Sequence, residues 1–319
     1  MTDLQRPRSA SQIVTTALDL IGNTPLVALD RIHSGPGRIF AKMESMQPGG
    51  SMKDRAARAC IEGARKRGEL ATGQPVVEMT SGNMGAALAV VCNLYGHPFH
   101  AYMSVGNSPE RARMMRALGA NVVLVPQVDG RPGMVTGSDI AAAAEKARDA
   151  ATELGAYFVD QFSNPGVVTA HEKGTGPEIV EALEMVPDAF VSVVGTGGTF
   201  VGVARHLKSL VPSTLCVAVE PAGAEVLADK PVVKPAHNLQ GSGYAIRPPL
   251  WDEKLADLFL SVTDEEATNY RQRLASLESI HAGFTAAANV CATVKLLKSG
   301  ILPDDAVVAT VICDTGLKY

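Results

Sequence analysis

The sequence lacks an excess of basic residues. Its 29 lysines and arginines stand against 33 aspartates and glutamates, which gives a net charge of −4 at pH 7. A protein that binds nucleic acid neutralises phosphates with clustered lysines and arginines. Nucleic acid is therefore not an expected partner, and the charge balance favours a protein that acts on small molecules.

Long apolar runs are also missing. No run reaches the roughly 20 residues that a membrane-spanning helix requires. The N-terminal segment MTDLQRPRSASQIV has no apolar run of the kind that a secretory signal peptide contains. We therefore expect a soluble, cytoplasmic protein with no membrane partner.

Cysteine pairs are absent as well. The five cysteines stand singly in apolar stretches without a C-x-x-C pair, and the seven histidines make no close pairs with them. Isolated cysteines of this kind are typical of reduced thiols in a cytosolic protein. Neither a disulfide framework nor a metal site is expected.

What the sequence does contain is an alternation of short β-type runs and helical runs. The expected strands are 38–44, 76–79, 99–103, 121–125, 190–194, 215–220 and 306–313, and the expected helices are 53–67, 83–95, 109–118 and 138–154. Such alternation predicts an α/β fold whose mainly parallel sheets are flanked by helices.

The length of 319 residues suits one large domain or two smaller ones. Residues 46–159 hold a full set of alternating units. We expect this span to form a smaller, mobile domain, inserted into a large domain built from residues 1–45 and 160–319.

A lysine in the first turn of a helix is the first candidate for chemistry. Ser51 is a plausible N-cap for the helix that contains Lys53, with Asp54 three residues further on. The helix dipole is positive at this end, so a lysine shielded from water there would have a lowered pKa, as an imine-forming amine requires. From this segment alone, an exposed lysine on a capped helix is the alternative. A nucleotide P-loop is excluded, because Met52 and Asp54 flank the lysine.

A second candidate is the turn Thr80-Ser81-Gly82-Asn83-Met84-Gly85, which lies between an expected strand and an expected helix. Such a turn offers backbone amides and two hydroxyls at a helix N-terminus, which suits a carboxylate or a phosphate. Asn83 is placed to hydrogen-bond a ring oxygen. The alternative is an ordinary capping turn.

A third candidate is Gly195-Thr196-Gly197-Gly198-Thr199, which follows the expected strand 190–194. Three glycines and two hydroxyls before a helix form a phosphate cradle. A dinucleotide motif does not fit, because position 200 is Phe. A Gly-rich turn without a ligand is the alternative.

The fourth candidate, Cys313-Asp314-Thr315-Gly316, follows the last expected strand. The hydroxyl of Thr315 would suit a ring nitrogen, and Asp314 competes for the same role. A turn that merely ends the strand is again the alternative.

Taken in order, these motifs resemble those of the cysteine synthase family of fold-type II pyridoxal-phosphate enzymes. The likeness covers nearly the whole chain. It includes IGNTPLV (21–27), GGSMKDR (49–55), TSGN (80–83), QFSNP (161–165), GTGGT (195–199), VEP (219–221), QGSG (240–243) and DTG (314–316). The resemblance implies two domains, with the cofactor pyridoxal 5′-phosphate in the cleft between them, and a homodimer.

The resemblance also implies residue roles. Lys53 would hold the cofactor as a Schiff base and later move the α-proton of the substrate. Asn83 would meet the ring hydroxyl and Thr315 the pyridine nitrogen. The phosphate would be bound by Gly195, Thr196, Gly197, Gly198 and Thr199. The amino-acid substrate would be bound by Thr80, Ser81, Gly82, Asn83, Met84, Gln161 and Gly241.

The implied reaction is β-replacement on an O-activated serine through an aminoacrylate. O-acetylserine and sulfide are the default substrates, and cysteine and acetate are the products. Met84 departs from the family, which usually has threonine there, and the loop 127–137 looks longer than in plain sulfhydrylases. Residues 281–287 keep only part of a family segment. These departures favour, as alternatives, an amine or another thiol as nucleophile. Serine or threonine deamination and a non-catalytic scaffold are weaker alternatives.

Overall fold

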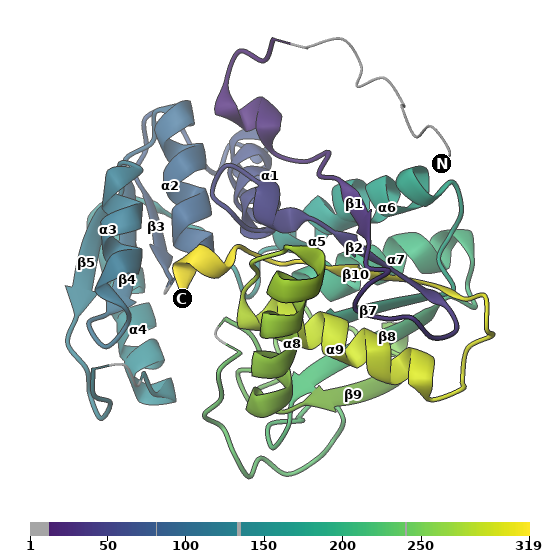
Figure 1. Ribbon diagram of the computed structural model, residues 1–319. Coiled ribbons are helices and arrows are strands. Elements are labelled where there is room, and N and C mark those ends of the chain that lie inside the picture. The colour runs from purple at the N-terminus through teal and green to yellow at the C-terminus, as the bar shows by residue number, and fades with distance from the viewer. Residues whose placement is uncertain (1–12, 81, 133–134, 240) are drawn as a thin grey trace.

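The fold consists of two sheets with helices packed on their faces, as the computed structural model describes for residues 13–80, 82–132, 135–239 and 241–319 (Figure 1). The predicted α/β class, with mainly parallel strands flanked by helices, is confirmed. Among the helices of these residues, none combines the length and apolar character that crossing a membrane requires. Two residues of the loop expected at 127–137 lie outside the described ranges.

The larger sheet has six strands in the order β1-β2-β10-β7-β8-β9. Their bounds are β1 (Leu26–Ala28), β2 (Arg38–Lys42), β7 (Ala189–Val193), β8 (Leu215–Pro221), β9 (Leu258–Val262) and β10 (Val307–Val311). β1 runs antiparallel to β2, and the other neighbouring pairs are parallel. Parallel strands covered on both faces are largely apolar, and all five residues of β7, Ser192 included, are buried.

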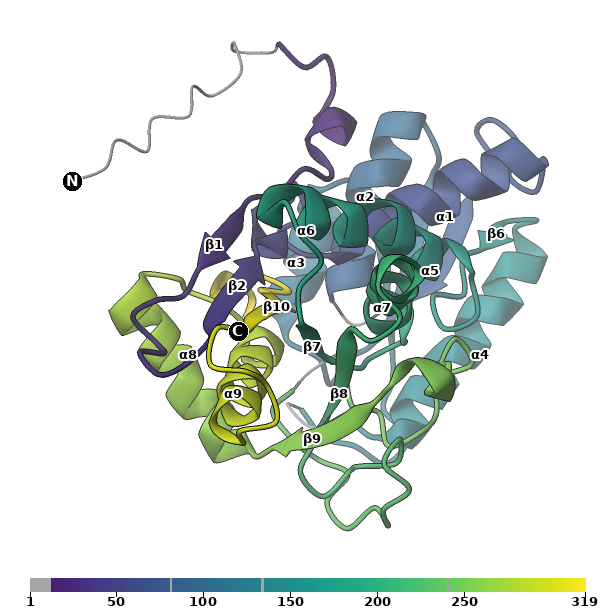
Figure 2. The same cartoon turned by 90° about the vertical axis from the view of Figure 1, so that its right-hand side faces the viewer.

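Helices cover both faces of this sheet. They are α6 (Gly176–Leu183), α7 (Gly198–Leu210), α8 (Asp264–Glu278) and α9 (Phe284–Lys298). α9 packs against β7, β8, β9 and β10, and α7 lies on the opposite side of β7 (Figure 2). The elements expected from the sequence do not include α6, α8, α9, β1, β9 or the short strand β6 (Tyr157–Phe158).

The smaller sheet has four parallel strands in the order β5-β4-β3-β6. They are β3 (Val76–Met79), β4 (Phe99–Ser104), β5 (Asn121–Val125) and β6 (Tyr157–Phe158), flanked by α1 (Lys53–Arg67), α2 (Asn83–Tyr95), α3 (Pro109–Ala117) and α4 (Gly137–Glu153). Alternate residues of β3 face opposite sides, as strand geometry requires. Val76 packs with residues of α1 and α2, and Val77 packs with Ala147 and Ala151 of α4.

The predicted helix ends at glycine are confirmed. Gly68 closes α1 with a φ of 76°, and Gly96 closes α2 with a φ of 72°. Glycine reaches this left-handed conformation without the steric cost that a Cβ atom brings. Both helices therefore end at a glycine that is already visible in the sequence.

A buried ion cluster ties the start of α1 to the larger sheet. Arg55 contacts Glu44 at 2.7 Å and Glu178 of α6 at 2.6 Å, and Lys42 of β2 contacts Glu178 at 2.7 Å. Removing one partner of a buried pair leaves an uncompensated charge, which is strongly destabilising. This cluster therefore holds the helix that begins at Lys53 in place.

A short helical run connects the two sheets. It consists of α5 (Gly166–Ala170), a π-helix (His171–Thr175) and α6 in direct succession. Four 3₁₀ segments, Ala17–Leu20, Glu44–Met46, Glu253–Leu255 and Gly316–Lys318, complete the described structure. π-helical turns are rare overall, but many of those that occur lie at functional sites. The π-helix of this protein begins at His171, so this residue is a candidate for a functional role.

Candidate functional site

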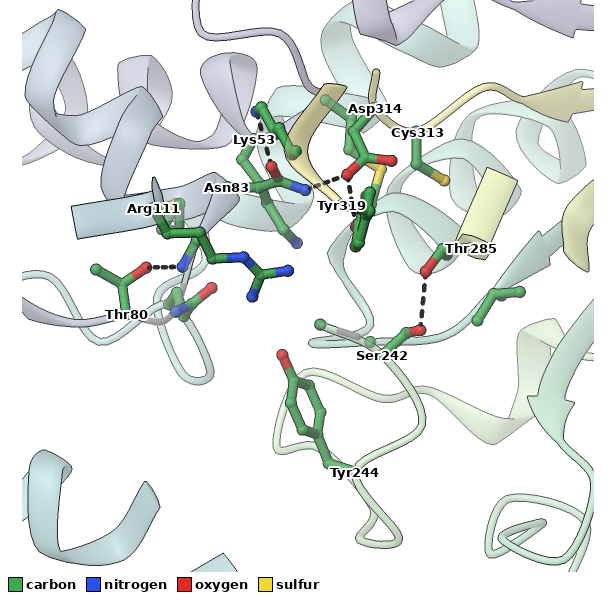
Figure 3. Close-up of a pocket in the computed structure, with 18 of the residues that line it drawn as sticks. Lys53, Thr80, Asn83, Arg111, Ser242, Tyr244, Thr285, Cys313, Asp314 and Tyr319 are labelled. Carbon is green, nitrogen blue, oxygen red and sulfur yellow. Dashed lines mark hydrogen bonds between the residues drawn. The ribbon is translucent and has the colours of Figure 1, made fainter. Parts of the chain in front are cut away.

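A pocket lies where strands of both sheets end. Thr80 follows β3, Gly195 follows β7 and Asp314 follows β10, and the carboxyl ends of parallel strands are the usual place for ligands in open α/β sheets. The pocket is lined by Met52, Lys53, Thr80, Gly82, Asn83, Met84, Arg111, Met114, Gln161, Val193, Gly195, Gly241, Ser242, Tyr244, Thr285, Cys313, Asp314, Lys318 and Tyr319 (Figure 3). Distant parts of the chain therefore meet here.

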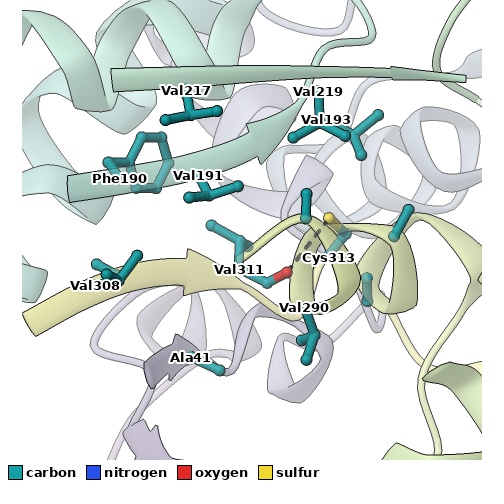
Figure 4. Packing of buried hydrophobic residues seen from close by; sticks show 14 of the residues in the cluster. Ala41, Phe190, Val191, Val193, Val217, Val219, Val290, Val308, Val311 and Cys313 are labelled. Atoms are coloured by element: carbon teal, nitrogen blue, oxygen red, sulfur yellow. Dashed lines mark hydrogen bonds between the residues drawn. The ribbon is translucent and has the colours of Figure 1, made fainter. Parts of the chain in front are cut away.

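The floor of the pocket is rigid because the strands beneath it are packed on both faces. Val191, Val217 and Val308 have no exposed surface, and Val311 packs in the same layer (Figure 4). Close packing of this kind tolerates little movement. The side chains at the strand ends are consequently held in fixed positions.

Lys53 is the first residue of α1 and lines the pocket, although only 9% of its surface is exposed. Burial lowers the pKa of Lys53 below its ordinary value of 10.5, while nearby Cys313, Cys60 and Asp314 oppose the shift. A lowered pKa provides the neutral amine that imine formation needs. The exposed surface lysine, the alternative left open by the sequence, does not apply.

Ser51 and Asp54 make hydrogen bonds around the start of α1, although Ser51 is not the N-cap that the sequence predicts. The Ser51 hydroxyl accepts from the Lys53 amide at 3.3 Å, and the Asp54 carboxylate accepts from the Ser51 amide at 3.3 Å. The formal N-cap is Met52, one residue later than expected. These bonds orient the backbone of Lys53 toward the pocket.

The turn Gly195–Thr199 joins β7 to the N-terminus of α7. Its glycines permit close approaches: a Cβ on Gly195 would lie 2.8 Å from the Gly241 carbonyl oxygen, and one on Gly198 would lie 2.3 Å from Val167 Cγ1. Gly197 is the N-cap, with a φ of 90°. Backbone N–H groups at a helix N-terminus bind phosphate. The residues present therefore fit a phosphate group, although only Gly195 of the five lines the pocket itself.

The turn after β3 forms the opposite wall. Thr80, Gly82, Asn83 and Met84 line the pocket, and the Thr80 hydroxyl accepts from the Gly85 amide at 2.9 Å. Ser81, predicted to bind substrate here, lies outside the described residues. The turn presents polar groups at the N-terminus of α2, which suits a carboxylate.

Gln161 lines the same wall and contacts a buried acid. Its side-chain nitrogen donates to Glu78 at 3.2 Å and to the Met79 carbonyl at 3.3 Å. Burial raises the pKa of Glu78 to about 8, with hydrogen bonds from Gln161 opposing the shift and the Asp160 charge adding to it. Glu78 therefore carries little charge at neutral pH.

Asn83 is held by the C-terminal segment. Its side-chain nitrogen donates to Asp314 at 2.7 Å, and its oxygen accepts from Lys318 at 2.8 Å (Figure 3). Tyr319 donates to the same Asp314 carboxylate at 2.8 Å. The sequence motifs contained no signal for Lys318 or Tyr319, because both follow the last motif and reach the pocket only through the fold.

Two threonines differ in their relation to the pocket. Thr315, expected to meet a ring nitrogen, does not line the pocket, and its hydroxyl accepts from the Leu317 amide at 3.3 Å. Thr285, in the first turn of α9, lines the pocket and lies 3.3 Å from the Ser242 hydroxyl. The sequence analysis did not single out Thr285, although the family-like segment 281–287 that contains it was a signal that could have found it.

Arg111 and Tyr244 were also missed. Both line the pocket, and Figure 3 shows the guanidinium of Arg111 and the hydroxyl of Tyr244 directed toward the same space. The Tyr244 ring packs edge-on against Phe162, with ring centroids 5.3 Å apart. Burial raises the pKa of Tyr244 to about 12, so its hydroxyl stays a neutral donor. Gly241, predicted to lie near the substrate amino group, lines the pocket on this side.

No metal-binding arrangement stands out. The described residues contain no group of three or more His, Cys, Asp or Glu side chains placed to hold an ion. None of the five cysteines forms a disulfide, and all are buried: Cys60, Cys92, Cys216, Cys291 and Cys313.

Comparisons with known proteins agree with this geometry. Residues 17–314 match the family described as pyridoxal-phosphate dependent enzyme. Cysteine synthase A of Salmonella typhi is 41% identical over 282 residues, which cover 86% of this chain and 84% of that protein. A hydrogen sulfide-producing enzyme of Fusobacterium nucleatum superposes with a TM-score of 0.88 at 32% identity, covering 97% of this chain and 98% of that one. An O-acetylserine-dependent cystathionine β-synthase of Helicobacter pylori gives a TM-score of 0.86 at 32% identity, with 97% of each chain covered.

Proposed function

The chain belongs to the family of pyridoxal-phosphate-dependent enzymes and is of the cysteine synthase type, and we propose that it makes cysteine and acetate from O-acetylserine and sulfide. The observation that carries this proposal is Lys53, a buried amine with a lowered pKa that lies in a pocket at the ends of β3, β7 and β10. When bound, pyridoxal phosphate supplies the electron sink for removing the α-proton and expelling the β-substituent.

The side chains of the pocket and the backbone of the adjoining glycine-rich turn divide this work among them. Lys53 holds the cofactor and, once displaced by the substrate amine, takes the α-proton with its Nζ atom. The glycine-rich turn at residues 195–199 binds the phosphate through backbone N–H groups. Asn83 meets the ring hydroxyl, oriented by its bonds to Asp314 and Lys318.

The ring nitrogen is assigned to Thr285 in place of Thr315. The hydroxyl of Thr285 lines the pocket and has Ser242 beside it, whereas the hydroxyl of Thr315 bonds to its own backbone turn. A neutral hydroxyl at this position leaves the ring nitrogen largely unprotonated. This favours β-elimination over transamination, because less negative charge is drawn into the ring.

The substrate carboxylate is assigned to the wall formed by Thr80, Gly82, Asn83 and Gln161. The amides at the N-terminus of α2 favour a negative group there. Gly241 lies across the pocket, where the substrate amino group would be. The walls therefore bind an α-amino acid by its two charged ends.

A different nucleophile is the second candidate. Met84 lines the pocket and has no hydrogen-bond donor, and one solved relative is named as a cystathionine β-synthase that depends on O-acetylserine. A thiol or amine larger than sulfide fits an apolar wall formed by Met84 and Met114. The name of the Fusobacterium relative supports a hydrogen sulfide-producing reaction as a further alternative.

The domain division, the dimer and the cytoplasmic location stay predictions. The smaller sheet lies entirely within residues 46–159 and the larger sheet entirely outside them, which supports the proposed division. Light scattering after size-exclusion chromatography tests the dimer.

The visible spectrum of the purified protein tests the proposal. We expect a yellow protein whose band is lost in Lys53→Ala and changes when O-acetylserine is added. Sulfide, homocysteine and small amines are then ranked by their rates of restoring the original spectrum. A colourless protein that takes up no pyridoxal phosphate would overturn the cofactor assignment, and a spectrum unmoved by O-acetylserine would overturn the donor.

A further inference from the structure

A chain of buried hydrogen bonds lies behind the glycine-rich turn. The Nδ1 atom of His171 is 2.9 Å from the Thr175 hydroxyl, and its Nε2 atom is 3.1 Å from the Thr199 hydroxyl. Thr199 also donates to the Met52 sulfur at 3.3 Å, next to Lys53. Thr199 is the last residue of the turn, so this series of hydrogen bonds ends where a phosphate would bind.

The fold brings His171 this close because two glycines of α7 have no side chains. A Cβ on Gly202 would lie 2.4 Å from the Val168 carbonyl oxygen and 2.9 Å from His171 Cβ. A Cβ on Gly198 would meet Val167. Since both contacts involve the segment that leads into the π-helix, α7 and the π-helix pack with backbone against backbone. The rare helix type thus places an imidazole directly against the turn.

The imidazole is neutral. His171 has no exposed surface. Burial lowers the pKa of His171 well below its ordinary value. The charges of Arg55 and Lys53 lower this pKa further, whereas the charge of Glu178 raises it. A neutral imidazole has one donor nitrogen and one acceptor nitrogen. Which nitrogen carries the hydrogen therefore decides how the Thr199 hydroxyl is used.

Thr175 settles the tautomer. In the part of the chain that the structure describes, Nδ1 of His171 is the single hydrogen-bond partner of the Thr175 hydroxyl. A buried hydroxyl hydrogen without an acceptor is costly, so Thr175 donates to Nδ1. Nε2 then carries the hydrogen and donates to Thr199, whose own hydrogen is left for another acceptor. In this structure that acceptor is the sulfur of Met52, which is a weak one.

We propose that His171 is a positioning residue that turns the Thr199 hydroxyl into a donor for the cofactor phosphate, with Thr175 holding the required tautomer. The inference rests on the phosphate assignment in the proposed function. His171 itself touches neither cofactor nor substrate. A phosphate oxygen replaces the Met52 sulfur as the acceptor, and a hydrogen bond to a charged group is stronger than one to a neutral sulfur.

The test compares two ligands that differ only in the phosphate. Cofactor is removed from the full-length protein, and pyridoxal phosphate or pyridoxal is titrated back while the visible band is followed. For His171→Phe we expect affinity for pyridoxal phosphate to fall roughly 10- to 100-fold, the effect of one hydrogen bond to a charged group. Affinity for pyridoxal should stay within about twofold of the wild type, because pyridoxal has no phosphate to bind.

Two further variants separate positioning from general damage. His171→Gln keeps a side-chain donor and should recover part of the affinity for pyridoxal phosphate. Thr175→Val leaves the imidazole in place but frees the tautomer, so its loss should be smaller and again confined to pyridoxal phosphate. If His171→Phe does not fold, Thr175→Val carries the same comparison.

A matched control is His97→Phe. His97 is also buried and hydrogen-bonded, through Nδ1 to the Gln74 carbonyl at 3.0 Å, but it does not line the pocket. This variant should lower stability without changing the affinity for either ligand. Equal losses for pyridoxal phosphate and pyridoxal in the His171 variants, or no loss, would overturn the inference. A wild-type protein that binds no pyridoxal phosphate would instead overturn the proposed function.

Discussion

Replacing Glu78 with glutamine should remove the part of the pH dependence of stability between about pH 5 and pH 8 that comes from this residue. Glu78 has only 1% of its surface exposed, and its Oε2 atom is buried with no hydrogen-bond partner among the described residues. Burial raises the pKa of Glu78 from its ordinary value of 4.5 to about 8. The folded protein therefore keeps a proton that the unfolded chain releases.

The sign follows from that difference. Where the folded state binds more protons than the unfolded state, stability falls as pH rises. The stabilisation from Glu78 is fully present below pH 4.5 and is lost as pH rises through about 8. The slope is at most about 1.4 kcal/mol per pH unit and is smaller near each pKa, so the free energy of unfolding should fall by about 3.5 kcal/mol between pH 5 and pH 8 on account of this residue. Glutamine cannot ionise and keeps an oxygen that accepts from Gln161.

Urea unfolding at several pH values measures the effect, with fluorescence of Trp251, the single tryptophan, as the signal. The difference in the free energy of unfolding between variant and wild type should grow in favour of the variant as pH rises. Glu69→Gln is the control, because Glu69 is exposed beside Arg67 and its removal should leave the slope unchanged. A difference that is constant from pH 5 to pH 8 would refute a raised pKa at Glu78.

Three further predictions concern packing and the pocket. Met84→Thr adds a hydroxyl at the wall of the pocket. It should lower the KM for the amino-acid donor about fivefold, which is the effect of one hydrogen bond. Steady-state kinetics measure this change, and an unchanged KM would contradict the prediction. Gly202→Ala places a Cβ 2.4 Å from the Val168 carbonyl oxygen and should cost about 2 kcal/mol in urea unfolding. Gly137→Ala, with nothing within 4 Å of the added Cβ, is its control and should cost far less. Because the five cysteines are buried, a thiol reagent should label none of them until the protein is unfolded, and rapid labelling of the native protein would contradict their burial.

Local features were predictable from the sequence. The start of α1 at Lys53, the ends of α1 and α2 at glycine, and the strands β3 and β5 lie where the sequence places them. Each depends on neighbouring residues, through helix caps, left-handed glycines or apolar runs. α8 and α9 were not assigned, although Thr263 and Glu266 form a capping box at the start of α8.

Contacts between distant segments were not predictable in this way. Arg111 on α3, Tyr244 in the loop after β8 and Lys318 near the C-terminus meet in one pocket, but no spacing in the sequence connects them. The π-helix at His171 was equally hidden, because it depends on the close packing of α7 against the preceding helix.

The sequence by itself determined the α/β class, the place of Lys53 at the start of a helix and the glycine-rich turn before α7, because helix ends, strand periodicity and turns are encoded within a few consecutive residues. Only the tertiary structure decided that Thr285 lines the pocket and Thr315 does not, and that His171 lies behind Thr199. Which side chains face a common space depends on how strands are ordered and how closely helices pack, and these are properties of the whole chain.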